Sequence, residues 1–194
     1  MRYSLPMAHA VLTRTPSVFR SMLIGLPHEW LTSPEKPGAW SPHEIACHVA
    51  DLEHDAWLPR IHAIVDSQWT DSLPNVNRER FRERYAGVSL EEVLHDFSTV
   101  RAANLAALGQ LQLDDDTLAT TGTHSQLGTV RLSHLLSTWV VHDLTHMAQI
   151  NRTMASRYRS EVGPWADLLS ILRHNPTTTP QLPDHPSPHT PNNH

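Results

Sequence analysis

Apolar residues recur at helical spacing in four long segments of this chain, and no segment alternates apolar and polar residues over a useful length as a β-strand does. The predicted helices run over about 16–25, 42–67, 89–111 and 129–159, and a short last helix begins after Gly163 and Pro164. Amphipathic helices bury their apolar stripes against one another. The pattern therefore predicts an all-α fold, a four-helix bundle with a short extra C-terminal helix.

Capping signals mark the starts of two of these helices. Ser41 is followed three residues later by Glu44, and Ser89 is followed in the same way by Glu92, which is the spacing of a capping box. Pro59 lies inside the second predicted helix and removes one backbone donor. We expect that helix to be kinked at the proline rather than ended by it.

The segments between the helices are predicted to be connections. Residues 27–40 contain three prolines and a glycine, 70–87 are polar and rich in arginine, with a short helical piece expected, and 114–128 are rich in turn residues. Residues 174–194 hold six prolines, one acidic side chain and a single leucine. Because such a segment buries too little apolar surface to offset its chain entropy, we expect a disordered tail after one domain over 1–173.

Composition and charge narrow the class of protein. With 39% hydrophobic and 18% charged residues the chain is globular, and no apolar run approaches the roughly 20 residues of a membrane span. The N-terminus has no apolar signal segment, so a cytoplasmic protein without a membrane partner is expected. A net charge of −5 without clustered Lys or Arg argues against a nucleic-acid partner. The single cysteine, Cys47, excludes an internal disulfide and a Cys-rich metal site, so His, Asp or Glu must hold any metal.

His142 and His146 form the most informative pair in the sequence. With 100° per residue on a helix, both fall in the arc that also contains Leu135, Trp139 and Ile150, and so in the stripe that faces the core. Side chains four residues apart lie about 6 Å apart at Cβ, which suits two ligands of one metal ion. A buried pair of neutral histidines held by hydrogen bonds would show the same spacing, so both interpretations stand at this point.

A third ligand has to come from another helix, and His48 is the candidate. His48 lies at the edge of the apolar arc of the second predicted helix, whereas His43, His54 and His62 lie elsewhere on that helix. Three protein ligands leave a coordination position open. An open position is typical of a catalytic metal site rather than a structural one.

Polar residues beside these histidines are candidates for catalysis or for support. Gln149 falls at the edge of the histidine stripe, where it would orient a ligand, and Glu53 is a proton acceptor or, equally, a buried partner for an arginine. We take Glu53 and Gln149 as the candidate catalytic residues. Asp143 points about 100° away from His142, so an ion pair with an arginine of a neighbouring helix is at least as good an interpretation as catalysis. Cys47 is expected to fill the core.

Two stretches of the sequence resemble the DinB/YfiT-like superfamily. Residues 40–53 read WSPHEIACHVADLE, and residues 138–150 read TWVVHDLTHMAQI. These stretches carry the W-S…H…E and H-D-x-x-H-x-x-Q signatures of the superfamily. The resemblance extends from the start of the first predicted helix to Trp165, and so covers nearly everything before the tail.

The resemblance implies a bundle of up-down-down-up connection and a divalent metal, zinc or nickel, held by three histidines. On this chain the matching positions are His48, His142 and His146. The resemblance also implies a transferase that joins a low-molecular-weight thiol, such as bacillithiol or mycothiol, to a small electrophile. A metal-dependent hydrolase and a non-catalytic bundle that binds a metal or a partner in stress response are the alternatives. A homodimer is a further expectation.

Overall fold

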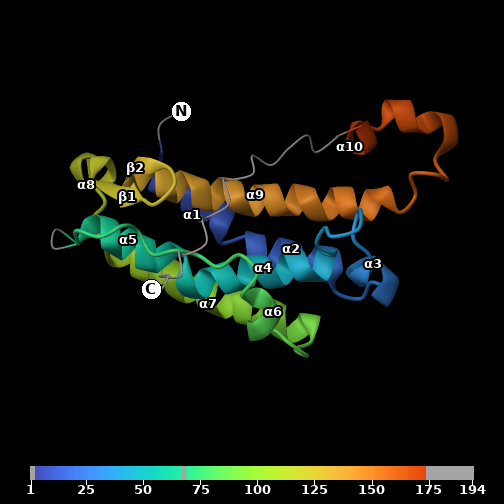
Figure 1. The fold of residues 1–194 in the computed structure, drawn as a ribbon, viewed down its shortest axis with the longest axis horizontal. Coiled ribbons are helices and arrows are strands. Elements are labelled where there is room, and N and C mark those ends of the chain that lie inside the picture. Colours follow the sequence, from blue (N-terminus) through green and yellow to red (C-terminus); the bar gives the residue numbers. More distant parts are fainter. Residues whose placement is uncertain (1–2, 67–68, 174–194) are drawn as a thin grey trace, which may run out of the picture.

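The computed structural model describes residues 3–66 and 69–173. Its long helices pack against one another along their lengths (Figure 1). Four helical segments form the bundle: α1 (Leu5–Leu12) with α2 (Thr15–Leu23), α4 (Pro42–Asp55) with α5 (Trp57–Val65), α7 (Leu90–Gln110), and α9 (Leu132–Ser156). The chain runs one way through the first segment, returns through the second and the third, and reverses again in α9 (Figure 1). The predicted all-α, up-down-down-up bundle is confirmed.

Shorter elements lie in the connections and at the C-terminal end: α3 (His28–Thr32), α6 (Phe81–Arg84), α8 (Asp115–Ala119), β1 (Thr121–His124), β2 (Gly128–Arg131), the 3₁₀-helix η1 (Gly163–Leu168) and α10 (Ser170–Arg173). The expected tail over 174–194 lies outside the described residues. Among the helices of the described residues, none has the length and apolar character needed to cross a membrane.

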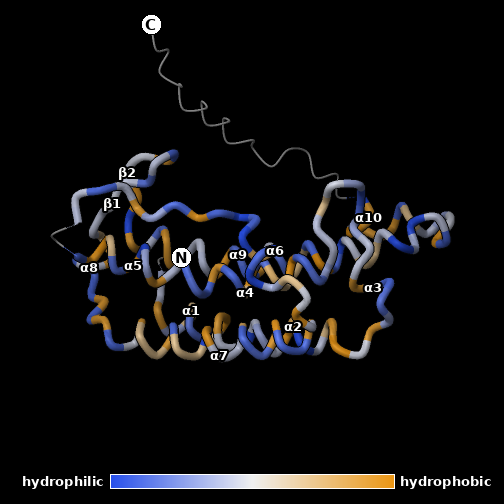
Figure 2. Tube along the Cα trace, turned by 60° about the horizontal axis from the view of Figure 1, so that its bottom comes forward, coloured by the Kyte–Doolittle hydropathy of each residue, from blue (hydrophilic) through white to orange (hydrophobic). Residues whose placement is uncertain are grey.

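The helix boundaries follow local signals where those signals are strong. The Ser41 hydroxyl accepts a hydrogen bond from the Glu44 backbone N–H while the Glu44 carboxylate accepts one from the Ser41 backbone N–H, and Ser89 and Glu92 do the same at α7. Both predicted capping boxes are therefore present. Along the long helices apolar and polar residues alternate at short intervals, as amphipathic helices require (Figure 2).

The second predicted helix is broken rather than kinked. It ends at Asp55, and α5 begins at Trp57 after Ala56, whose φ of −105° departs from regular helical geometry. Pro59 lies in the first turn of α5, where its ring would clash with the carbonyl of Asp55 in a continuous helix. The break therefore falls one turn before the proline that causes it.

Two elements differ from the sequence prediction. Helix α1 was not predicted, because eight residues with weak amphipathic pattern give little signal; its Ala8 and Leu12 are buried by contacts with the rest of the bundle. The antiparallel hairpin of β1 and β2 was not predicted either, because strands of four residues are too short to show alternation. Gly122 in β1 packs so closely that an added Cβ would lie 2.9 Å from the Ile64 side chain.

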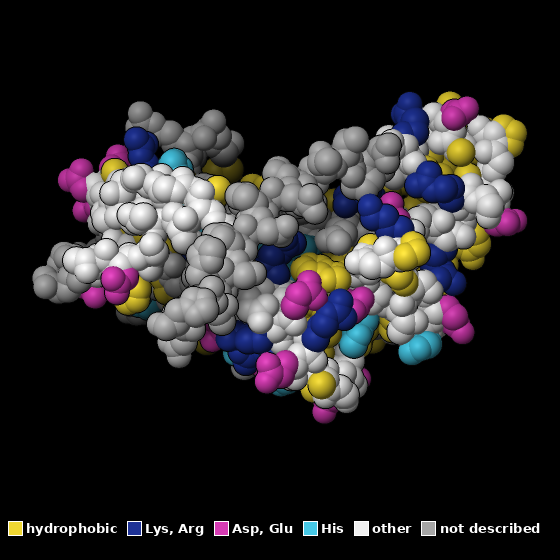
Figure 3. Space-filling model, viewed as in Figure 1, with side chains coloured by type: hydrophobic (Ala, Val, Ile, Leu, Met, Phe, Trp, Pro, Cys, Tyr) yellow, Lys and Arg dark blue, Asp and Glu magenta, His cyan; other side chains and the backbone are white. Residues whose placement is uncertain are grey.

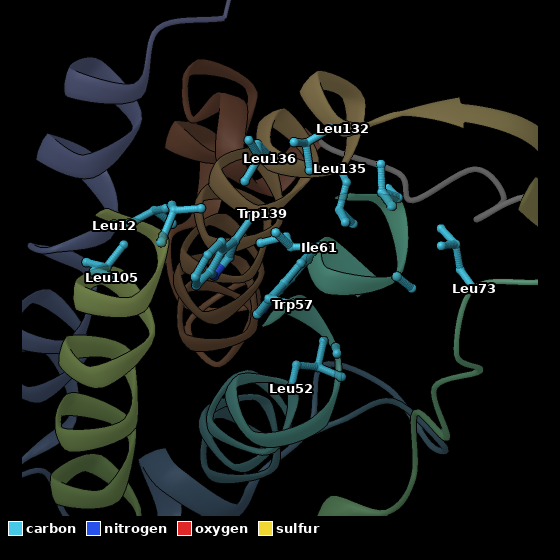
Figure 4. Close-up of a cluster of buried hydrophobic side chains, with 14 residues drawn as sticks. Leu12, Leu52, Trp57, Ile61, Leu73, Leu105, Leu132, Leu135, Leu136 and Trp139 are labelled. Carbon is cyan, nitrogen blue, oxygen red and sulfur yellow. The ribbon is translucent and has the colours of Figure 1, made fainter. Parts of the chain in front are cut away.

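Two groups of buried apolar side chains fill the bundle. One lies toward the hairpin end and is built around Trp57 and Trp139, whose rings stack with centroids 5.5 Å apart (Figure 4). The other lies among α2, α4, α6, α7 and α9 and is built around Phe19, Phe81 and Phe97. The long helices are therefore packed on both halves of the bundle, and the polar groups that lie between the halves have fixed surroundings.

A buried arginine connects the helices where they come together. Arg101 of α7, 1% exposed, donates to the Asp143 carboxylate of α9 at 2.7 Å, to Glu53 of α4 at 2.8 Å and to the backbone carbonyl of Leu12 at 2.8 Å. Glu53 also accepts a hydrogen bond of 3.0 Å from the Trp139 indole N–H. One guanidinium thus contacts groups from α1, α4 and α9.

We expect Arg101→Met to destabilise the protein by about 3–5 kcal/mol, because it leaves two buried carboxylates without their cation. Arg20→Met is the matched control, since Arg20 forms an exposed ion pair with Glu91 that should contribute less than about 1 kcal/mol. Urea unfolding of both variants measures the difference.

The same measurement on Arg101→Met combined with Glu53→Gln and Asp143→Asn should recover part of the lost stability, because the unpaired charges are removed together. An Arg101→Met variant no less stable than Arg20→Met would show that these buried ion pairs do not hold the helices together.

Candidate metal centre

Three histidines converge between α4 and α9. His48 comes from α4, and His142 and His146 come from successive turns of α9. One ring nitrogen from each lies within 4.8 Å of the other two, and the Nε2 atoms of His142 and His146 are 3.1 Å apart. His48 and His146 are buried, while His142 is partly exposed. The structure thus brings together the three residues that the sequence analysis selected.

Hydrogen bonds at the far side of two rings fix their orientation. The Nδ1 atom of His48 lies 3.2 Å from the backbone carbonyl oxygen of Arg78, and the Nδ1 atom of His146 lies 2.8 Å from Oε1 of Gln149. Because a carbonyl oxygen only accepts, each Nδ1 is assigned the proton and each Nε2 keeps its lone pair. Nδ1 of His142 is buried and, within the described residues, has no hydrogen-bond partner.

The donor set fits a divalent metal ion. Two nitrogens that each lie about 2.1 Å from one ion are roughly 3.0–3.4 Å apart, depending on the coordination angle, and the 3.1 Å between His142 and His146 falls in this range. Imidazoles whose second nitrogen donates to a carbonyl are the usual arrangement of metal-binding histidines. The sequence left open a pair of merely hydrogen-bonded histidines, and the convergence of a third ring nitrogen from α4 favours the metal site over that alternative.

The surroundings keep these histidines neutral. Burial is the main cause that lowers the pKa of His48 to about 3 and that of His146 to about 4, and it also lowers the pKa of His142 well below its ordinary value. The positive charge of Arg78 lowers all three values further. At neutral pH the imidazoles therefore have their lone pairs free for a metal ion.

Aromatic rings surround the histidines. The Trp40 ring centroid lies 4.5 Å from that of His48 and 6.3 Å from that of His146, and the Trp57 ring lies 5.3 Å from that of His142. Phe81 of α6 contacts both Trp40 and His48. These rings shield the histidines from water on several sides and strengthen electrostatic interactions among them.

The other residues singled out from the sequence lie in different places. Gln149 contacts His146, as expected of a residue that orients a ligand. Glu53 and Asp143 both bind Arg101, which is the arginine pairing expected as one interpretation of each. A role of Glu53 as a proton acceptor stays a prediction. Cys47 is buried, and burial raises the pKa of its thiol to about 12, which fits its expected place in the core.

Sequence reasoning missed the contribution of the connection between α5 and α7. Arg78 supports His48 through its backbone carbonyl, and no residue type signals a backbone acceptor in advance. Trp40 and Trp57 also escaped notice as neighbours of the histidines. The place of Trp40 in the same motif as His48 would have been a usable signal.

The fold and these histidines define a helical-bundle protein with a candidate metal centre between its second and fourth segments. The chain belongs to the DinB superfamily, whose family model matches residues 12–150. The family resemblance stated from the sequence is therefore confirmed. No curated protein matches the chain in sequence.

Among solved structures the chain is similar to YfiT from Bacillus subtilis, described as a probable metal-dependent hydrolase with an unusual four-helix bundle topology. The similarity covers 80% of this chain and 93% of that one, with a TM-score of 0.66 and 17% sequence identity. At this identity the match establishes a shared fold, in agreement with the connection of the four segments seen in Figure 1.

We expect the metal-free protein to lose stability as the pH falls from 7 to 5. In the folded protein His48 and His146 stay neutral over this range, whereas in the unfolded chain they bind protons below about 6.5. The unfolded state then binds more protons, so each histidine contributes a loss of up to about 1.4 kcal/mol per pH unit below 6.5. Urea unfolding at the two pH values measures this loss.

The double variant His48→Gln with His146→Gln is the control, because its carboxylates titrate as in the wild type while the two buried imidazoles are gone. Its stability should fall less between pH 7 and pH 5. Equal losses in the two proteins would contradict the assignment of neutral, buried histidines.

Proposed function

We propose that this protein is a divalent-metal-dependent enzyme that transfers a low-molecular-weight thiol to a small electrophile. The observation that carries the proposal is the convergence of three imidazole nitrogens within 4.8 Å of one another. Three neutral protein ligands with no fourth beside them among the described residues suit a catalytic centre with an open position. Zinc and nickel are the candidate ions, since both accept imidazole ligands.

The chain's own residues would hold and orient the ion. His48, His142 and His146 are the proposed ligands, and Gln149 and the Arg78 carbonyl hold two of the rings in place. We assign Gln149 this positioning role in catalysis. A divalent ion bound here would supply Lewis acidity, which lowers the pKa of a thiol or water at the open position.

The electrostatics of the site support a thiol as the nucleophile. In the described part of the chain, no carboxylate forms a hydrogen bond or an ion pair with any of the three histidines, whose rings contact a backbone carbonyl, an amide and one another. The nearest acidic candidates from the sequence, Glu53 and Asp143, are bound to Arg101. A site without a free base suits a thiol, whose ordinary pKa near 8.5 needs a much smaller shift than the value of about 15.7 for water.

Hydrolysis is the second candidate. It is favoured by the description of YfiT, which shares this fold, as a probable metal-dependent hydrolase. The same three histidines would serve either reaction. A thiol-independent turnover of an ester or amide would place hydrolysis first, and the absence of any turnover by metal-loaded protein would favour a non-catalytic binding role.

We expect the purified protein to bind about one zinc or nickel ion per chain at this site, and His146→Ala to abolish stoichiometric binding while leaving most of the helix content. Gln149→Leu removes only the partner of His146 and should weaken binding by about 10- to 100-fold. Competition with a chromogenic chelator measures the affinity, and circular dichroism measures the helix content.

His62→Ala is the matched control, because His62 is an exposed histidine on α5 away from the cluster. Its metal affinity should equal that of the wild type. Full binding by His146→Ala, or an equal loss in His62→Ala, would overturn the proposed ligand set.

We also expect a low-molecular-weight thiol to bind the cobalt-substituted protein and to produce a sulfur-to-cobalt charge-transfer band. His48→Ala should weaken the thiol's binding at least about tenfold or remove the band altogether. Consumption of a chromogenic electrophile in the presence of the thiol should depend on the same residue. Full cobalt binding without a band on addition of thiol would move hydrolysis or a binding role ahead.

A further inference from the structure

Four arginines alternate along the segment that enters and forms α6, and three of them are paired with acids. Arg80 and Arg84 both bind Asp51 and Asp55, and Arg82 binds Glu44 and Glu79. Basic and acidic side chains are correspondingly interleaved over α6 on the surface (Figure 3). These pairs neutralise most of the charge that the segment carries.

Arg78 is the exception in this series. Its side chain is exposed, and within residues 3–66 and 69–173 its guanidinium has no ion pair or hydrogen bond. The Cζ atom lies instead 5.6 Å from the Trp40 ring centroid. A guanidinium placed over an aromatic ring keeps its fork of N–H donors free at the edge for a planar acceptor.

Arg78 stands beside the histidine centre. Its backbone carbonyl holds His48, and its aromatic neighbour Trp40 contacts the rings of both His48 and His146. The Arg78 side chain thus lies one aromatic ring away from two of the three proposed ligands, close enough for its charge to act on a ligand at the centre.

We propose that the Arg78 side chain binds a carboxylate of the ligand that occupies the histidine centre, so that the protein selects carboxylate-bearing substrates. This inference rests on the proposed function, since the ligand is the thiol or the second reactant of that reaction. The observation that carries the proposal is a guanidinium, unpaired among the described residues, that lies beside Trp40 and the histidines.

The chemistry of the centre favours an anion at this point. Neutral imidazoles do not cancel the charge of a divalent ion, and the acids around α6 are already paired with other arginines. A guanidinium near a bound cation attracts an anionic ligand, and it pairs with a carboxylate through two parallel hydrogen bonds.

A pair of thiols of matched size, one charged and one neutral, tests the proposal on the wild-type full chain. Mercaptopropionate and its uncharged amide, mercaptopropionamide, are titrated into the cobalt-substituted protein, and the charge-transfer band gives each dissociation constant. We expect the carboxylate to bind about tenfold more tightly than the amide, and we expect that preference to shrink at high salt.

Variants at one position then assign the preference. Arg78→Gln should lose most of the preference for the carboxylate, Arg78→Lys should keep more of it than Arg78→Gln, and Arg78→Glu should keep the least. Because the Arg78 contact with His48 is made by the backbone, the side-chain variants should keep their cobalt. Arg20→Gln is the matched control, since Arg20 is an exposed arginine of α2 paired with Glu91, and it should keep the wild-type preference.

The carboxylate can belong to the thiol or to the second reactant, and a further titration distinguishes the two. Propionate is titrated into the protein with bound mercaptopropionamide and followed by calorimetry. Propionate binding that is lost in Arg78→Gln, with no difference between the thiols, would place the carboxylate on the second reactant.

The inference is overturned if the two thiols bind equally to the wild type and propionate binding is the same in wild type and Arg78→Gln. If neither thiol gives a band although cobalt is fully bound, the thiol-transfer function is overturned instead. Titration of propionate into the cobalt protein without thiol would then still decide whether Arg78 binds a carboxylate.

Discussion

The buried ion pairs of Arg101 with Glu53 and Asp143 constrain how the helices of this bundle can rotate against one another. Asp143 follows His142 on α9, and successive side chains of a helix point about 100° apart. With the Asp143 carboxylate bound to Arg101, the His142 imidazole therefore points toward α4. Removing Arg101 would leave two buried carboxylates without a cation, which costs far more than an exposed pair gains. The positions of the histidines therefore depend on a charge cluster that does not itself contact them.

The histidine centre combines this rigid support with one contribution from a connection. Ligand candidates that stand on packed helices keep their geometry without a bound ion, and Gln149 and the Arg78 carbonyl fix the remaining rotation of two rings. The aromatic rings around them make ionisation of the imidazoles unfavourable. The folded protein thus holds its ligands neutral, and this lowers its stability at low pH. A divalent ion would offset this loss by binding to the folded state.

The arginine-rich segment before α7 has two physical roles in one stretch of sequence. Arg80, Arg82 and Arg84 attach the segment to α4 through its acids, which holds the Arg78 backbone against His48. The Arg78 side chain lies over Trp40, and among the described residues its N–H donors have no acceptor. Arg78 therefore supports the centre through its backbone and selects the ligand through its side chain.

The sequence by itself determined the helical class, the two capping boxes, the histidine pair on α9 and the family, because each depends on residues that are close together in the chain or on a recognisable motif. Tertiary structure decided which acids pair with Arg101 and which backbone carbonyl holds His48. These features depend on contacts between residues about 30 or more positions apart, or on backbone atoms common to every residue. Local propensity carries no information about such contacts, since packing of the whole bundle sets them.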